Sequence, residues 1–81
     1  MGNAEEVIEK EHIDFLFEGD SKSGKTEHWG VIAKDGAYIG EIKWYASWRK
    51  YVYYPEDGTL YDSNCMDTIS EFIKGLMGKR R

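Results

Sequence analysis

The stretch from Tyr38 to Tyr54, Y-I-G-E-I-K-W-Y-A-S-W-R-K-Y-V-Y-Y, holds two of the three tryptophans and five of the six tyrosines of this 81-residue chain. Aromatic and β-branched residues favour strands, so the stretch predicts a β-hairpin. With Ala46-Ser47 as a two-residue turn, Tyr45 lies opposite Trp48 and Ile42 lies opposite Tyr51. Ala-Ser is not a favoured pair for such a turn, and a slip of one residue would exchange the two faces of the hairpin.

The alternation of side chains along a strand divides this hairpin into two faces. The first is nearly uncharged and is the predicted core face; it carries Tyr38, Gly40, Ile42, Trp44, Arg49, Tyr51 and Tyr53. Gly40 on this face leaves room for the ring of Tyr53. The second face has three charges through its middle; it carries Ile39, Glu41, Lys43, Tyr45, Trp48, Lys50, Val52 and Tyr54.

The rest of the chain predicts an α+β fold, a four-stranded antiparallel β-meander with one C-terminal α-helix packed on one face. Residues 12–61 form the meander, with Asp35-Gly36 as a hairpin turn that pairs Ala33 with Tyr38. A short edge strand is expected at Thr59–Tyr61. Apolar residues at helical spacing predict a helix over 63–78, ended by Gly78. Residues 1–11 are expected to fray or to form a short helix. The predicted core consists of Ile13, Phe15, Phe17, Trp29, Val31, Tyr38, Ile42, Trp44, Tyr51, Tyr53, Ile69, Phe72, Ile73 and Leu76.

Charge and cysteine content restrict the class of protein. The net charge is −4, and residues 1–20 carry seven acids against one lysine. An acidic chain is a poor non-specific binder of nucleic acid. The single cysteine allows no disulfide within the chain, and no apolar run is long enough to cross a membrane. A single soluble cytoplasmic domain is therefore expected, with no membrane partner.

Residues Gly19–Thr26, G-D-S-K-S-G-K-T, match the Walker A pattern for nucleotide phosphates. That chemistry requires a strand, then the loop, then a helix whose N-terminus faces the phosphates. The residues that follow the loop alternate as a strand does, and no Walker B aspartate follows later. The sequence therefore predicts a solvated hairpin loop and no nucleotide site.

Trp48-Arg49-Lys50-Tyr51 has the letters that name the plant WRKY DNA-binding domains. That family continues with G-Q-K and ligates zinc through two cysteines and two histidines. Here Val52-Tyr53-Tyr54 follows, and one cysteine cannot supply such a site. The match is interpreted as coincidence.

Three further side chains carry reactive groups. Cys65 lies at the predicted helix start, where the dipole can activate a thiol, but a structural role is favoured because no histidine is near in sequence. His12 and His28 lie on adjacent strands and are expected to be solvated. No nucleophile, base and orienting group come together, so no catalytic residue, metal or cofactor is predicted and the chain is not expected to be an enzyme.

The chain resembles a family of short, uncharacterised proteins of phages and bacterial genomes. The resemblance covers about residues 25–74. It rests on Gly40-Glu41-Ile42-Lys43-Trp44, Trp48-Arg49-Lys50-Tyr51 and Pro55, followed by Cys65-Met66, Ile69 and Phe72-Ile73. Tyr53 and Met66 are mild departures from the pattern. The resemblance implies no known activity; it suggests a phage or prophage accessory protein that binds a host or phage macromolecule.

The second face of the hairpin is the candidate binding site, because exposed clusters rich in tryptophan and tyrosine mark interfaces. The predicted site residues are Ile39, Lys43, Tyr45, Trp48, Lys50, Val52 and Tyr54. A protein partner is the first hypothesis. Nucleic acid is the alternative, with bases stacked on the aromatic rings. Two further alternatives would cover the face without a foreign partner: the N-terminal segment folded over it, or a homodimer formed through the face or a sheet edge.

Overall fold

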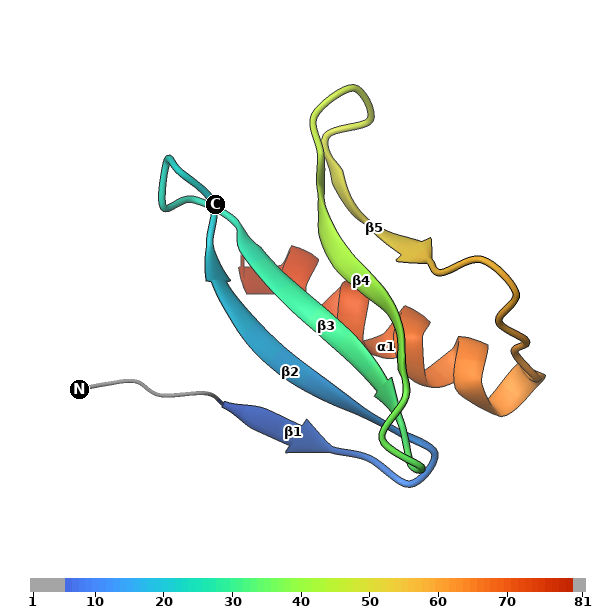
Figure 1. Ribbon diagram of the computed structural model, residues 1–81. Helices are drawn as coiled ribbons and strands as arrows, with labels where there is room; N and C mark the ends of the chain where they lie inside the picture. Colours follow the sequence, from blue (N-terminus) through green and yellow to red (C-terminus); the bar gives the residue numbers. More distant parts are fainter. Residues whose placement is uncertain (1–5, 80–81) are drawn as a thin grey trace.

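The computed structural model describes residues 6–79, which form one antiparallel sheet and one helix (Figure 1). The five strands lie side by side in chain order and are β1 (Val7–Glu9), β2 (Ile13–Asp20), β3 (Glu27–Ala33), β4 (Tyr38–Tyr45) and β5 (Lys50–Pro55). The helix α1 (Ser63–Lys79) follows them. The α+β class and the C-terminal helix are confirmed, and the predicted number of four strands is wrong.

The additional strand is β1, in the segment expected to fray or to form a short helix. Val7 pairs with Leu16 and Ile8 with Phe15, so β1 extends the sheet beyond β2. The amide of Phe17 donates to the carbonyl of Glu6 at 2.8 Å, which continues the pairing. Pairing with the long strand β2 satisfies the backbone of a segment too short to show a strand pattern alone. Residues 1–5 lie outside the described residues.

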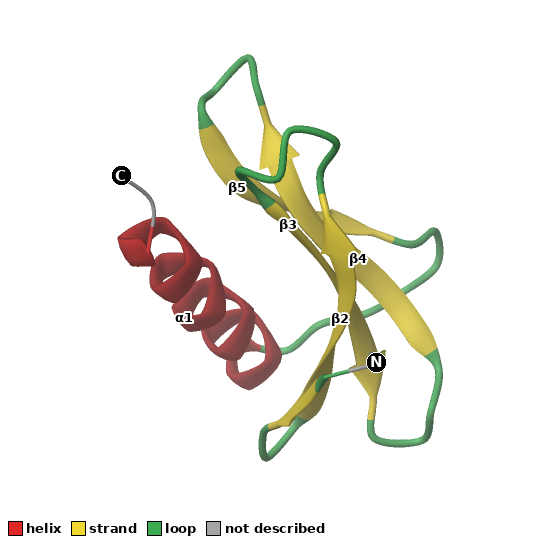
Figure 2. Ribbon diagram, turned by 90° about the vertical axis from the view of Figure 1, so that its left-hand side faces the viewer, coloured by secondary structure: helices red, strands yellow, loops and turns green. Residues whose placement is uncertain are grey.

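The core lies between the sheet and α1, as Figure 2 shows. Its most buried side chains come from the three central strands: Ile13, Phe15, Val31 and Ile42. From the helix, Ile69 and Leu76 are buried, and Phe72 stacks on Phe15 with ring centroids 4.0 Å apart. The predicted core is confirmed apart from Tyr38, which is 42% exposed.

The β4–β5 hairpin is shifted by two residues from the predicted pairing. Tyr45 lies opposite Lys50 and Ile42 opposite Tyr53, so four residues, 46–49, connect the strands. Arg49 closes this connection with φ = 57° and donates its amide to the carbonyl of Tyr45 at 2.9 Å. A two-residue Ala46-Ser47 turn would need positive φ at residues that rarely adopt it. Because side chains alternate with a period of two, a shift of two leaves the residues that pair in the structure on their predicted faces. Trp48 and Arg49, which were predicted to pair with Tyr45 and Trp44, lie in the connection instead.

The β3–β4 hairpin places Tyr38 and Ile39 on faces opposite to the predicted ones. Gly36 adopts φ = 95°, and the amide of Ala33 donates to Ala37 instead of pairing with Tyr38. Tyr38 therefore lies opposite Ile32, while Val31 lies opposite Gly40 as predicted. Ile39 is the extra residue of the resulting β-bulge. The bulge moves Tyr38 away from the core and lets Ile39 pack against it.

The connection from β5 to α1 contains no strand, so the edge strand expected at Thr59–Tyr61 is wrong. Tyr61 instead donates its hydroxyl to the carbonyl of Ile39 at 2.7 Å, while Leu60 is 94% exposed. Asp62 caps the helix by accepting the amide of Cys65 at 2.9 Å. Gly78 lies inside α1, which continues to Lys79, one residue beyond the predicted end.

Candidate binding surfaces

The face of the sheet opposite α1 is covered by no other element of the described chain (Figure 2). We call this surface the open face. The strand register aligns one row of residues across it, namely Val7, Leu16, Gly30, Glu41 and Tyr54. The N-terminal segment, as far as it is described, extends the sheet edge as β1 and does not fold over this face. Within residues 6–79, the open face is therefore uncovered.

An aromatic pair dominates the open face where β4 meets the turn to β5. The rings of Tyr45 and Trp48 meet edge to face, with centroids 5.0 Å apart. Trp48 is 65% exposed and Tyr45 is 37% exposed. Exposed apolar side chains that cluster are typical of an interface, whereas single ones are not. The pair is held by the hairpin backbone, so its geometry does not depend on a ligand.

Most other predicted site residues gather around this pair. Lys50 lies opposite Tyr45, and Val52 lies opposite Lys43. The ammonium of Lys43 sits 4.7 Å from the ring centroid of Tyr54 and 3.5 Å from a carboxylate oxygen of Glu41. Ile39 does not join them, because the bulge turns it toward the core. Alternation predicted the faces of these strand residues although the predicted hairpin register was wrong, and it contains no signal of the bulge at Ile39.

The middle of the open face contains a contact that sequence reasoning missed. Tyr38, which the bulge moves to this face, donates its hydroxyl to the carboxylate of Glu18 at 2.9 Å. Burial and this hydrogen bond raise the pKa of the Tyr38 phenol above its usual range. Both side chains reach over Gly30, where an ideal Cβ would lie 2.7 Å from Glu18 and 2.8 Å from Tyr38.

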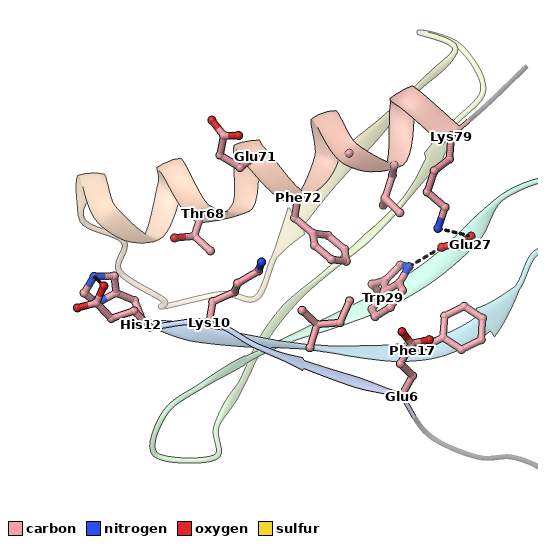
Figure 3. Close-up of a pocket in the computed structure, with 14 residues that line it drawn as sticks. Glu6, Lys10, His12, Phe17, Glu27, Trp29, Thr68, Glu71, Phe72 and Lys79 are labelled. Carbon is pink, nitrogen blue, oxygen red and sulfur yellow. Dashed lines mark hydrogen bonds and ion pairs between the residues drawn. The ribbon is translucent and has the colours of Figure 1, made fainter.

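A groove of about 780 Å³ lies on the other side of the sheet, between β1 and α1 (Figure 3). Its floor is apolar and its rim charged; the lining includes Ile8, Phe17, Trp29, Phe72, Leu76, Glu6, Lys10, Glu71 and Lys79. At one end Glu27 accepts the indole N–H of Trp29 at 2.9 Å and pairs with Lys79 at 3.4 Å. Sequence reasoning missed this groove because β1, which forms one wall, was not predicted.

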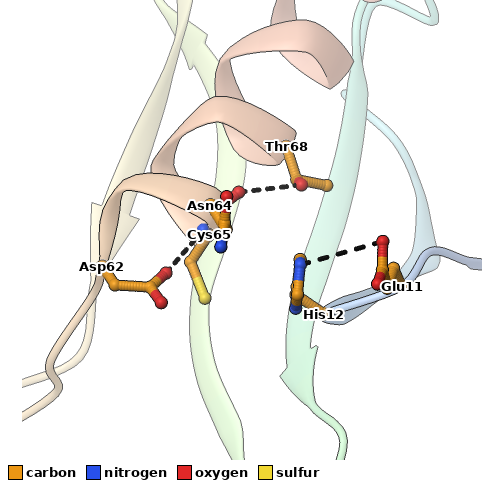
Figure 4. A network of polar contacts seen from close by, with 6 residues as sticks. All are labelled: Glu11, His12, Asp62, Asn64, Cys65 and Thr68. Atoms are coloured by element: carbon orange, nitrogen blue, oxygen red, sulfur yellow. Dashed lines mark hydrogen bonds and ion pairs between the residues drawn. The ribbon is translucent and has the colours of Figure 1, made fainter.

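Cys65 lies in a polar network at the helix start, with Asp62 on one side of it and His12 of the turn before β2 on the other (Figure 4). Burial of the thiol and its interaction with the Asp62 carboxylate raise the pKa of Cys65. His12 pairs with Glu11 at 3.9 Å. A thiol with a raised pKa is a weak nucleophile at neutral pH, so the geometry favours a structural role for Cys65.

The loop that matches the Walker A pattern connects β2 and β3, two antiparallel strands. The element after it is a strand, so no helix N-terminus faces the loop, as a phosphate site would require. Residues 6–79 contain no group of three or more metal-ligating side chains. No helix within these residues is long and apolar enough to span a bilayer.

Comparison with known proteins shows that the chain is similar to a phage protein. It is 34% identical over 58 residues to an uncharacterised 9.3 kDa protein of Acholeplasma phage L2, and the match covers 70% of this chain and 74% of the phage protein. No family model and no solved structure matches. The resemblance to short phage proteins is confirmed at this level. The chain belongs to the family of the 9.3 kDa protein of Acholeplasma phage L2.

Proposed function

We propose that this protein is a small non-catalytic binding module whose open face docks a protein partner. The observation that carries the proposal is the exposed Tyr45–Trp48 pair on a sheet face that no described element covers. Tryptophan and tyrosine supply much of the binding energy at protein interfaces, because they bury a large area at a small cost in side-chain entropy. Similarity to an uncharacterised phage protein supports an accessory role of this kind.

The cations beside the pair support a protein partner with defined polar contacts. Lys43 is already engaged by Glu41 and by the ring of Tyr54, which holds its ammonium in one place. The open face also carries Glu18 and Glu41, whose carboxylates repel a continuous phosphate backbone. A protein can match this mixture of charges and apolar surface residue by residue.

The test is affinity capture from cells that naturally express the chain, identification of the partner, and reconstitution with purified partner. Trp48→Ala should weaken the reconstituted complex by about thirtyfold or more, as expected for an aromatic hot spot. Leu60→Ala is the matched control, because Leu60 is an exposed apolar side chain outside the open face.

Both variants should keep the circular dichroism spectrum and unfolding midpoint of the parent chain, because surface substitutions usually change stability by about 0.5 kcal/mol or less. Equal affinity of the Trp48→Ala variant and the parent for the purified partner would reject the open face as the docking surface. Capture of nucleic acid in place of protein would reject the proposal that the partner is a protein.

A further inference from the structure

The antiparallel sheet brings two connections to one of its ends. These are residues 21–26, between β2 and β3, and residues 46–49, between β4 and β5 (Figure 1). The other connections, residues 10–12, 34–37 and 56–62, lie at the opposite end of the sheet. The end of α1 joins the first group, because Lys79 pairs with Glu27 at the start of β3.

Charge is divided between these two ends. The connections 21–26 and 46–49 contain Lys22, Lys25 and Arg49 and no acidic residue, a formal charge of +3. The connections at the opposite end contain two lysines against five acids, a formal charge of −3; they are Lys10, Lys34, Glu11, Asp35, Glu56, Asp57 and Asp62. We call Lys22, Lys25, Arg49 and Lys50 the basic end. A chain with a net charge of −4 therefore presents a local cationic surface.

The basic end keeps its charge when neighbouring strand ends are included. Asp20 and Glu27 lie there, but Lys50 and Lys79 balance them. Lys79 forms an ion pair with Glu27. The side chains of Lys22, Lys25, Arg49 and Lys50 are all exposed. The two connections stand apart in Figure 1, so these cations share one end of the sheet and not one compact patch. Exposed cations at one end of a molecule attract an anionic partner and select its orientation.

The basic end is continuous with the open face through Trp48. This residue precedes Arg49 in the connection between β4 and β5, and its ring contacts Tyr45 on the open face. A ligand that packs against the exposed indole therefore lies beside Arg49 and Lys50. The site combines an apolar anchor point with flanking cations.

We infer that the partner of the open face presents an acidic segment, in which an apolar side chain packs on Trp48 and flanking carboxylates meet the basic end. This inference rests on the proposed function and names the chemistry of the partner. An acidic peptide is favoured over nucleic acid because the carboxylates of Asp20 and Glu41 lie near the site. A peptide can place its few charges away from these groups, whereas a nucleic acid carries one at every phosphate.

The test uses fluorescence anisotropy with three labelled probes of equal length. The first is a peptide with a central phenylalanine between runs of glutamate, the second has lysine in place of glutamate, and the third is oligothymidylate. The glutamate peptide should bind and the other two should bind much more weakly. Binding should weaken with added salt, because the Debye length falls from about 30 Å at 0.01 M to about 3 Å at 1 M.

Two charge variants locate the site. Lys22→Gln/Lys25→Gln should weaken binding of the glutamate peptide by about threefold to thirtyfold, the range for two exposed ion pairs. Lys10→Gln/Lys34→Gln removes the same charge from the opposite end and should leave the affinity unchanged. Equal losses in both variants would show a general charge effect and overturn the basic end as the site.

The remaining outcomes separate this inference from the proposed function. If the glutamate peptide fails to bind while a purified partner is held through Trp48, the inference is overturned and the proposed function stands. If Trp48→Ala weakens binding of neither the glutamate peptide nor the purified partner, both the inference and the proposed function are overturned. If oligothymidylate binds more tightly than the glutamate peptide, the partner is a nucleic acid and both assignments to a protein are wrong.

Discussion

Tyr53 of β5 lies directly against the backbone of Gly40 in β4, in the space that a side chain at residue 40 would occupy. An ideal Cβ on Gly40 would meet the hydroxyl and ring carbons of Tyr53. The ring cannot easily move aside, because its hydroxyl donates to the carbonyl of Ile39 at 3.0 Å and contacts the hydroxyl of Tyr61. The prediction that Gly40 leaves room for the ring of Tyr53 is confirmed.

Gly40→Ala should lower the free energy of unfolding by about 1–3 kcal/mol, the usual cost of overpacking a core. Urea denaturation followed by circular dichroism measures this change. Gly30→Ala is the matched control, because its Cβ would meet the carboxylate of Glu18 and a ring carbon of Tyr38, and both side chains are exposed and have room to move aside. The control should cost clearly less. Equal costs for the two variants would contradict the packing described here.

Asp62 makes stability depend on pH. The hydrogen bond from the amide of Cys65 lowers the pKa of Asp62 in the folded chain. A carboxyl with a lowered folded pKa stabilises the fold above its unfolded pKa, and this stabilisation is lost as the pH falls through the folded pKa. Asp62→Asn keeps a good helix cap that cannot ionise. Its urea midpoint should therefore fall less than that of the parent chain between pH 7 and pH 2, and an equal fall would count against this assignment.

Cys65 should react slowly with alkylating agents in the folded protein. Its raised pKa leaves less thiolate at neutral pH, and partial burial restricts access. Mass spectrometry of iodoacetamide labelling at pH 8 should show a rate several-fold lower in buffer than in denaturing urea. Asp62→Asn should raise the rate in buffer, because it removes the nearby negative charge. A folded-state rate equal to that in urea would contradict the role proposed for the buried thiol.

A substitution at Lys25 distinguishes a solvated loop from a nucleotide-binding site. The residue is exposed in the connection between β2 and β3, so Lys25→Ala should change the free energy of unfolding by no more than about 0.5 kcal/mol. A ligand that binds only the folded state must raise the melting temperature. Thermal melts with and without Mg-ATP should coincide for the parent chain. An upward shift that disappears in Lys25→Ala would overturn the proposal that the protein is not an enzyme.

The faces of the strands were predictable from the sequence because alternation is local. Ile42, Trp44 and Tyr51 turn toward the helix and Lys43 and Val52 turn away, as predicted. This outcome survives the two-residue shift of the hairpin, since a shift of two does not change which face a residue occupies. The helix was predictable for the same kind of reason, from the spacing of its apolar residues.

The turns and the short edge strand were decided by tertiary structure. Arg49 adopts a positive φ, which no local pattern marks for an arginine. The bulge at Ile39 moves Tyr38 onto the open face, because Gly36 lengthens the β3–β4 turn. Strand β1 has only three residues, and it forms because its backbone can pair with the edge of β2.

The candidate site depends both on local sequence patterns and on tertiary structure. The sequence by itself assigned Tyr45 to the charged face of the hairpin, because alternation along β4 places it there; Trp48 lies in the connection between β4 and β5, where its ring contacts that of Tyr45. Only the tertiary structure decided that Tyr38 joins this face beside Glu18 while Ile39 leaves it for the core. The physical reason is that the bulge depends on how β3 and β4 pair across the turn at Gly36, and no local preference of Tyr38 or Ile39 contains that information.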